Sequence, residues 1–153
     1  MIFRRTLIAA LAGFFVTPTL GFASEDVLSA TRANVMIEAG ELILIDIRRP
    51  DEWEATGVAK GAWPLDMRQQ AFGGWLIETI ARNPDRRIAI ICRTGNRSGQ
   101  LQTILKKNNI NDVLDVSEGM VGGPNGKGWI ASGLPVVSAA EAIDAMPKNL
   151  TAD

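Results

Sequence analysis

The chain has 153 residues and a formal net charge of −1, with 16 basic and 17 acidic side chains. This length allows one domain, and an apolar fraction of 46% with a charged fraction of 22% is that of a folded protein, not a disordered one. The near-zero charge supplies no basic field for nucleic acid or an anionic membrane surface. The chain has no histidine and one cysteine, Cys92. These counts exclude Cys-His and Ser-His-Asp catalysis, an internal disulfide and a cysteine-rich zinc site.

The N-terminal segment has the pattern of an export signal. Two arginines precede the apolar residues 6–16, a Thr-Pro-Thr break follows, and the small residues Gly21 and Ala23 stand before Ser24. The apolar run is too short for a comfortable membrane span. We therefore expect a signal peptide at residues 1–23, cleavage before Ser24, a periplasmic location and no stable membrane association afterwards. An uncleaved N-terminal anchor is the alternative.

Helices and short apolar strands alternate along the rest of the chain. Their spacing predicts helices at 25–39, from Pro50 onwards, at 69–83, at 98–108 and after 139, and strands at 42–45, 62–65, 87–91 and 112–116. Runs such as 42–45 are typical of strands buried on both faces, and Pro64 favours an edge position for its strand. This alternation predicts an open α/β fold, with a parallel sheet of about five strands and helices on both faces.

Cys92 directly follows the strand at 87–91 and begins the sequence Cys-Arg-Thr-Gly-Asn-Arg-Ser. In open α/β sheets ligands bind at the carboxyl ends of the strands. A tight loop that leads into a helix directs several N–H groups, and the positive end of the helix dipole, to one point. Gly95 and Asn96 tolerate the left-handed backbone angles of such a loop, and Ser98 is expected to cap the helix.

Two arginines, Arg93 and Arg97, flank this loop. Together with the loop N–H groups they favour a thiolate, which is the nucleophilic form of cysteine. We therefore expect Cys92 to be an electropositive, partly exposed and reactive thiol. A buried and chemically idle cysteine is the alternative.

Residues 92–98 resemble the active-site loop of single-domain rhodaneses. Residues 44–53, which contain Asp46, Arg48 and Pro50, are similar to the strand and Asp-x-Arg-x-Pro-x-Glu segment of that family. The Gly-Ala turn at 61–62, residues 118–120 and residues 129–136 resemble its later motifs. Together these stretches cover nearly the whole chain after residue 24. The resemblance implies a rhodanese-like domain at 24–137, followed by a C-terminal tail at 138–153.

The resemblance also implies an activity. Cys92 would be the catalytic residue: it takes a sulfane sulfur from thiosulfate or a similar anionic donor as a persulfide and passes it to a thiophilic acceptor, cyanide or a thiol. No cofactor and no metal are implied. The loop residues would bind the substrate, and these are Arg93, Thr94, Gly95, Asn96, Arg97 and Ser98. Asp46 and Arg48 occupy positions that support the loop in the family.

Two departures from the family pattern stand out. The histidine that many relatives carry before the Gly-Ala turn is absent from residues 57–60. Residues 122–128 look like an insertion, which we expect to be a surface loop; a lid or rim that sets acceptor access is the alternative.

Two other functions remain open. A cysteine phosphatase or arsenate reductase also uses a Cys-loop-Arg arrangement, although here four residues separate Cys92 from Arg97, one fewer than in the usual phosphatase loop. The other is a non-catalytic rhodanese-like binding module, which the retained cysteine argues against.

Overall fold

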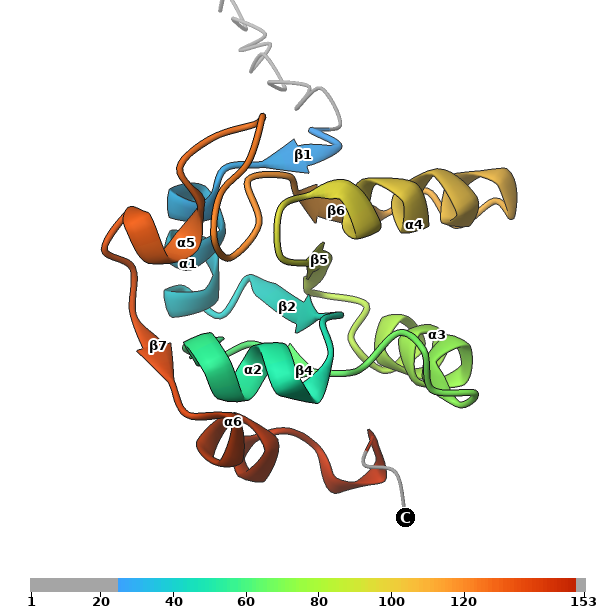
Figure 1. Ribbon diagram of the computed structural model, residues 1–153. Helices are drawn as coiled ribbons and strands as arrows, with labels where there is room; N and C mark the ends of the chain where they lie inside the picture. Colours follow the sequence, from blue (N-terminus) through green and yellow to red (C-terminus); the bar gives the residue numbers. More distant parts are fainter. Residues whose placement is uncertain (1–24, 151–153) are drawn as a thin grey trace, which may run out of the picture.

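The computed structural model describes residues 25–150, and a five-stranded sheet is its central element (Figure 1). The strands have the order β1-β6-β5-β2-β4, and every neighbouring pair is parallel. They are β1 (Val27–Leu28), β2 (Leu42–Asp46), β4 (Trp63–Pro64), β5 (Arg87–Ile91) and β6 (Val113–Val116). Two further strands, β3 (Val58–Ala59) and β7 (Val136–Val137), form a separate antiparallel pair. The predicted open parallel sheet is confirmed, with the Pro64 strand at its edge. The predicted signal peptide lies outside the described residues.

The helices surround the sheet. They are α1 (Ala30–Glu38), α2 (Pro50–Thr56), α3 (Phe72–Arg82), α4 (Asn96–Lys107), α5 (Gly128–Ala131) and α6 (Ala139–Ala145), with a final 3₁₀ turn at Lys148–Leu150. Pro50 is the first residue of α2, as predicted, because its fixed φ suits a helix start where no N–H partner is needed. Within residues 25–150, none of the helices has the length and apolarity needed to cross a membrane.

Alternate side chains of each strand enter two separate cores. Leu42 and Leu44 of β2 pack with α1 and α5 on one face, while Ile43 and Ile45 pack with α3 and α4 on the other. The five residues of β2 are all buried. Helices therefore cover both faces of the sheet, as the unbroken apolar runs indicated.

The predicted helix at 25–39 is wrong in its first turn. Val27 and Leu28 form β1, which pairs with Asp115 and Val116 of β6, and the helix begins only after Ser29. The Ser29 hydroxyl accepts the N–H of Arg32 at 3.1 Å and caps the helix. The fifth strand depends on a partner almost ninety residues away, which a local periodicity cannot detect.

Residues 139–150 are part of the packed structure. Ala139 and Ala142 of α6 belong to the core on the α1 face, and Met146 and Leu150 belong to the core on the α3 face. Each of these side chains is at most 5% exposed. The segment expected to be a C-terminal tail thus covers the β4 edge of the sheet.

Candidate active site

Cys92 lies immediately after β5, at the carboxyl edge of the sheet, and its side chain is 0% exposed. The expectation of a partly exposed thiol is therefore wrong for this conformation. The cause is the strand register: Ile88, Ile90 and Cys92 all point into the core beneath α3 and α4. The following loop then closes over the sulfur from the other side.

The loop directs two backbone N–H groups at the cysteine sulfur. The Gly95 N–H lies 3.1 Å from Cys92 Sγ and the Ser98 N–H lies 3.5 Å from it. The Ser98 hydroxyl oxygen is 3.4 Å from the same sulfur. Both amides belong to the start of α4, so the positive end of the helix dipole faces the thiol. This is an anion-binding arrangement built around a single sulfur atom.

Gly95, not Ser98, is the residue before the first turn of α4, so the prediction of Ser98 as the helix cap is wrong. Gly95 has φ +92°, and a Cβ at this position would overlap the carbonyl oxygen of Ser117. Both the backbone angle and the space therefore require glycine. Because the helix begins two residues earlier than predicted, Ser98 lies inside its first turn and faces Cys92.

The segment after β6 supports the loop from behind. The N–H groups of Met120 and Val121 donate to the carbonyl oxygens of Cys92 and Arg93, at 2.9 and 3.0 Å. The predicted surface loop at 122–128 continues this support while residues 123–127 stay exposed. Its Asn125 side chain donates to the Ser117 carbonyl at 3.2 Å.

Arg97 is held by a carboxylate. Its two terminal nitrogens donate to the two oxygens of Glu52 at 2.8 and 2.6 Å, which joins α4 to α2. Burial alone would raise the pKa of Glu52. Hydrogen bonds from Arg97 and from the Arg49 N–H, together with the positive charges of Arg97 and Arg48, outweigh this effect. The pKa of Glu52 is thereby lowered from 4.5 to about 2. The same hydrogen bond raises the pKa of Arg97, and a charge on Cys92 adds to this effect.

Asp46 and Arg48 form a fully buried ion pair below α2. Three hydrogen bonds of 2.7 to 3.1 Å join the guanidinium to the carboxylate. The remaining donors of Arg48 reach the Thr56 hydroxyl and the carbonyls of Glu52 and Gly57. Every direction of the guanidinium is thus satisfied, and the pair fixes the helix that carries Glu52.

The remaining predicted binding residues line the rim of the loop. Arg93 and Asn96 are exposed, while Thr94 is half-buried and packs beside Gly123. Within residues 25–150 the Arg93 side chain makes no ion pair. The loop thus combines one engaged arginine, Arg97, with one exposed arginine, Arg93.

The sequence model of the rhodanese-like domain matches residues 29–123, which include every residue of the loop. The chain belongs to the rhodanese-like domain family. The chain is similar to an uncharacterized protein of Rickettsia prowazekii, with 23% identity over 72% of this chain and 95% of that protein.

Solved structures show the same fold. A thiosulfate sulfurtransferase from Pseudomonas aeruginosa matches 73% of this chain and 20% of its own, with 23% identity and a TM-score of 0.57. A homodimeric polysulfide-sulfur transferase from Wolinella succinogenes matches 77% of this chain and 82% of its own, with 24% identity and a TM-score of 0.52. A possible tyrosine phosphatase from Rhodopseudomonas palustris matches 74% of this chain and 86% of its own, with 19% identity and a TM-score of 0.51.

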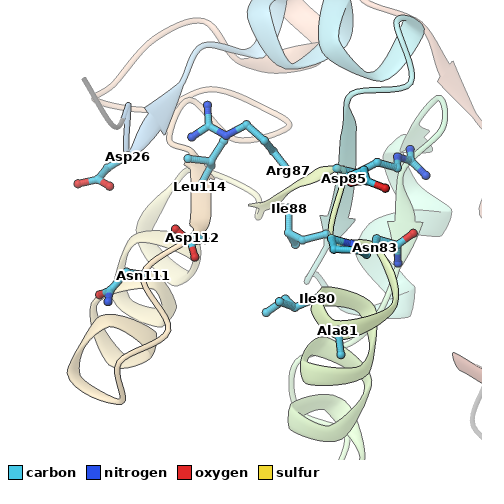
Figure 2. A pocket seen from close by; sticks show the side chains of 12 residues that line it. Asp26, Ile80, Ala81, Asn83, Asp85, Arg87, Ile88, Asn111, Asp112 and Leu114 are labelled. Atoms are coloured by element: carbon cyan, nitrogen blue, oxygen red, sulfur yellow. The ribbon is translucent and has the colours of Figure 1, made fainter. Parts of the chain in front are cut away.

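This rhodanese-like domain also has a cavity at the other edge of its sheet. Figure 2 shows side chains that line it, from the starts of β5 and β6 and from the end of α3. The cavity has a volume of about 540 Å³. Arg87 and Asp112 are among its lining residues. Because β5 runs the full depth of the sheet between Arg87 and Cys92, this cavity is separate from the cysteine loop.

Two side chains of the site were not singled out from the sequence. Glu52 is the glutamate of the Asp-x-Arg-x-Pro-x-Glu segment, so this motif already contained a signal for it. Asp115 lies on β6 under the first turn of α4 and is 4% exposed. No motif in the sequence marks it.

Proposed function

We propose that this rhodanese-like domain is a sulfurtransferase that carries a sulfane sulfur on Cys92, from thiosulfate or a similar donor to cyanide or a thiol. The observation that supports this proposal is that the N–H groups of Gly95 and Ser98 both point at Cys92 Sγ. Amides so directed, at a helix N-terminus, stabilise a negative charge on sulfur without a histidine base.

The reaction has two balanced halves. In the first, the Cys92 thiolate attacks the outer sulfur of thiosulfate, a new S–S bond forms, the donor S–S bond breaks, and sulfite leaves with the bonding electron pair. In the second, cyanide or a thiolate attacks the terminal sulfur of the persulfide, which restores the Cys92 thiolate and releases thiocyanate or a new persulfide. This is a ping-pong scheme through a covalent intermediate.

Sulfur transfer requires the loop to move. Cys92 is 0% exposed, and a persulfide needs room for a second sulfur atom. We propose that residues 93–95, which precede α4, open to admit the donor, while the Arg97–Glu52 pair keeps the start of α4 in place. The exposed Arg93 at the rim is then the arginine available to attract an anionic donor.

A phosphatase role has less support. In a Cys-loop-Arg phosphatase the arginine must bind the phosphoryl oxygens. Here both terminal nitrogens of Arg97 are engaged by Glu52. The loop is also built around one sulfur atom rather than a tetrahedral phosphate.

Sulfur loading tests the proposed function directly. The protein with residues 1–23 removed is incubated with thiosulfate, and in a parallel sample with polysulfide, and its intact mass is measured. We expect the mass of one added sulfur atom and its loss on addition of cyanide, with thiocyanate formed in equal amount. Cys92→Ser, which keeps the size of the side chain, should show no added mass.

Two results would contradict the proposal. Hydrolysis of an aryl phosphate without sulfur loading would favour the phosphatase. The absence of both activities in a folded protein whose thiol still reacts with an alkylating reagent would favour a non-catalytic binding module.

We also propose that the chain is exported and cleaved before Ser24, as the pattern of residues 1–23 predicts. Expression of the whole chain in a Gram-negative host should yield a periplasmic protein whose N-terminal residue is Ser24. A membrane-bound product that retains residues 1–23 would support the uncleaved anchor instead.

A further inference from the structure

The two arginines of the cysteine loop, residues 92–98, differ in the charge that they offer to a ligand. Arg93 is exposed and makes no ion pair within residues 25–150. Arg97 instead meets the carboxylate of Glu52 through two hydrogen bonds, at 2.6 and 2.8 Å. The loop therefore presents one uncompensated positive charge to an incoming anion, although its sequence contains two arginines.

Glu52 stays charged and in place beside Arg97. Its side chain is mostly buried, and its pKa of about 2 keeps it anionic at every pH at which a thiolate forms. One of its oxygens also accepts the N–H of Arg49 at 3.0 Å, which holds the carboxylate at the start of α2. An anion that displaced Glu52 from Arg97 would leave this carboxylate without its charged partner, which is costly.

The neighbouring segments add little free positive charge. The arginines between β2 and α2 are paired already. These pairs are Arg48 with Asp46 and Arg49 with Asp51. Lys127 is exposed and makes no ion pair with the described residues, but it lies in the segment at 122–128, outside the loop that surrounds the sulfur. Arg93 is thus the free cation of the loop itself.

This balance of charge bears on the sulfur donor. Thiosulfate carries two negative charges and has to approach a sulfur that is itself negative in its reactive form. Near Arg97 it meets the attraction of the guanidinium and the repulsion of Glu52 together, and the two effects largely cancel because the charges are adjacent. Arg93 then compensates one charge of the donor and leaves the other uncompensated.

We infer that Glu52 is a specificity-determining residue, which makes singly charged donors such as organic persulfides, rather than the dianion thiosulfate, the preferred substrates of Cys92. In the transfer, the Cys92 thiolate attacks the outer sulfur of R–S–S⁻ and a new S–S bond forms. The S–S bond of the donor breaks, and R–S⁻ leaves with the bonding electron pair. This inference deepens the proposed function and rests on it.

A matched pair of donors tests the preference. Methanethiosulfonate has the outer sulfur of thiosulfate but a methyl group in place of one oxygen, so it carries one negative charge instead of two. By intact mass, we expect it to load Cys92 faster than thiosulfate does in the unaltered protein, a comparison that needs no variant. In Glu52→Gln the ratio of the thiosulfate rate to the methanethiosulfonate rate should rise about five- to tenfold, because removing a negative charge favours the dianion more.

Alkylation of Cys92 measures the same charge without a sulfur donor. Iodoacetate is anionic and iodoacetamide is neutral, and the ratio of their rates cancels the loop opening that both reagents need. These two reagents also differ by one negative charge. The ratio of the iodoacetate rate to the iodoacetamide rate should therefore also rise about five- to tenfold in Glu52→Gln.

Two further variants serve as controls. Glu54→Gln removes an exposed carboxylate from the same helix and should change both ratios by less than about twofold, since solvent screens its charge. Glu52→Asp keeps the charge and should keep both ratios close to those of the unaltered protein. A merely structural role of Glu52 would instead make Glu52→Asp and Glu52→Gln behave alike, which would overturn the inference.

The remaining outcomes separate the inference from the proposed function. Loading of Cys92 with unchanged ratios in Glu52→Gln, or faster loading by thiosulfate than by methanethiosulfonate in the unaltered protein, would overturn the inference alone. If neither donor loads a thiol that both alkylating reagents reach, the proposed function fails and the donor preference fails with it.

Discussion

At the scale of single residues, Cys92 combines burial with a specific set of donors. The sulfur is inaccessible, yet two N–H groups and one hydroxyl surround it. This arrangement depends on Gly95, whose positive φ turns its own N–H toward the sulfur while its missing side chain leaves room for the Ser117 carbonyl. The loop thus stabilises a charge on sulfur at the expense of access to it.

Gly95→Ala should therefore damage both stability and sulfur loading. The left-handed angle alone costs about 1–2 kcal/mol for a residue with a Cβ, and the overlap with the Ser117 backbone adds to it. Gly40→Ala is the matched control: Gly40 has φ +74° but nothing within 4 Å of a Cβ. Urea unfolding should show a larger loss for Gly95→Ala than for Gly40→Ala, and sulfur loading should persist only in the latter. Equal losses would show that the overlap is relieved by a small shift.

At the scale of elements, α2 connects the sheet edge to the cysteine loop. Its C-terminal end is anchored by Arg48 to Asp46 of β2, and Glu52 in its first turn holds Arg97 of α4. The two ion pairs form a continuous connection from β2 to the helix whose first turn faces the sulfur. A disturbance of α2 should therefore change the position of α4 relative to Cys92.

The depressed pKa of Glu52 predicts how this connection depends on pH. Its value is about 2 in the folded chain against 4.5 ordinarily, so the folded state binds this proton less readily than the unfolded state. The stabilisation is complete above pH 4.5 and is lost as the pH falls toward 2. Glu52→Gln should lower the free energy of unfolding by about 2–3 kcal/mol at neutral pH, and the difference should shrink across that window.

Glu54→Gln is the control for this prediction, because Glu54 lies exposed on the same helix. We expect it to change the free energy of unfolding by no more than about 0.5 kcal/mol. A Glu52→Gln effect that stays constant between pH 6 and pH 3 would show that the carboxylate charge is not what holds α2 to α4.

At the scale of the whole molecule, the C-terminal residues close one edge of the sheet. The four side chains from Ala139 to Leu150 enter both cores, so the folded unit extends beyond the β3–β7 pair. They cover β4, the two-residue edge strand that would otherwise present unpaired backbone groups.

Met146→Ala should therefore destabilise the domain by roughly 2–5 kcal/mol, the usual effect of removing a large buried side chain. Met146 is 5% exposed and packs in the core that also contains Cys92. Ala140→Ser, at an exposed position of α6, should stay within about 0.5 kcal/mol of the unaltered protein in the same urea titration. A negligible effect of Met146→Ala would mean that α6 is detached in solution.

The sequence by itself determined the elements whose signals are local. Continuous apolar runs predicted β2, β5 and β6, Pro50 predicted the start of α2, and Pro64 predicted an edge strand. Each of these signals reflects the burial or the backbone geometry of adjacent residues. The same local order placed Cys92 at the carboxyl edge of the sheet, before a tight loop and a helix.

Only the tertiary structure decided which groups surround the sulfur. The pairing of β1 with β6, the Arg97–Glu52 ion pair across 45 positions and the complete burial of Cys92 all depend on contacts between distant segments. The type of a residue and its neighbours in the sequence indicate which chemistry its side chain can perform. Its partner, its exposure and its charge state follow from packing, which brings together segments that no local pattern relates.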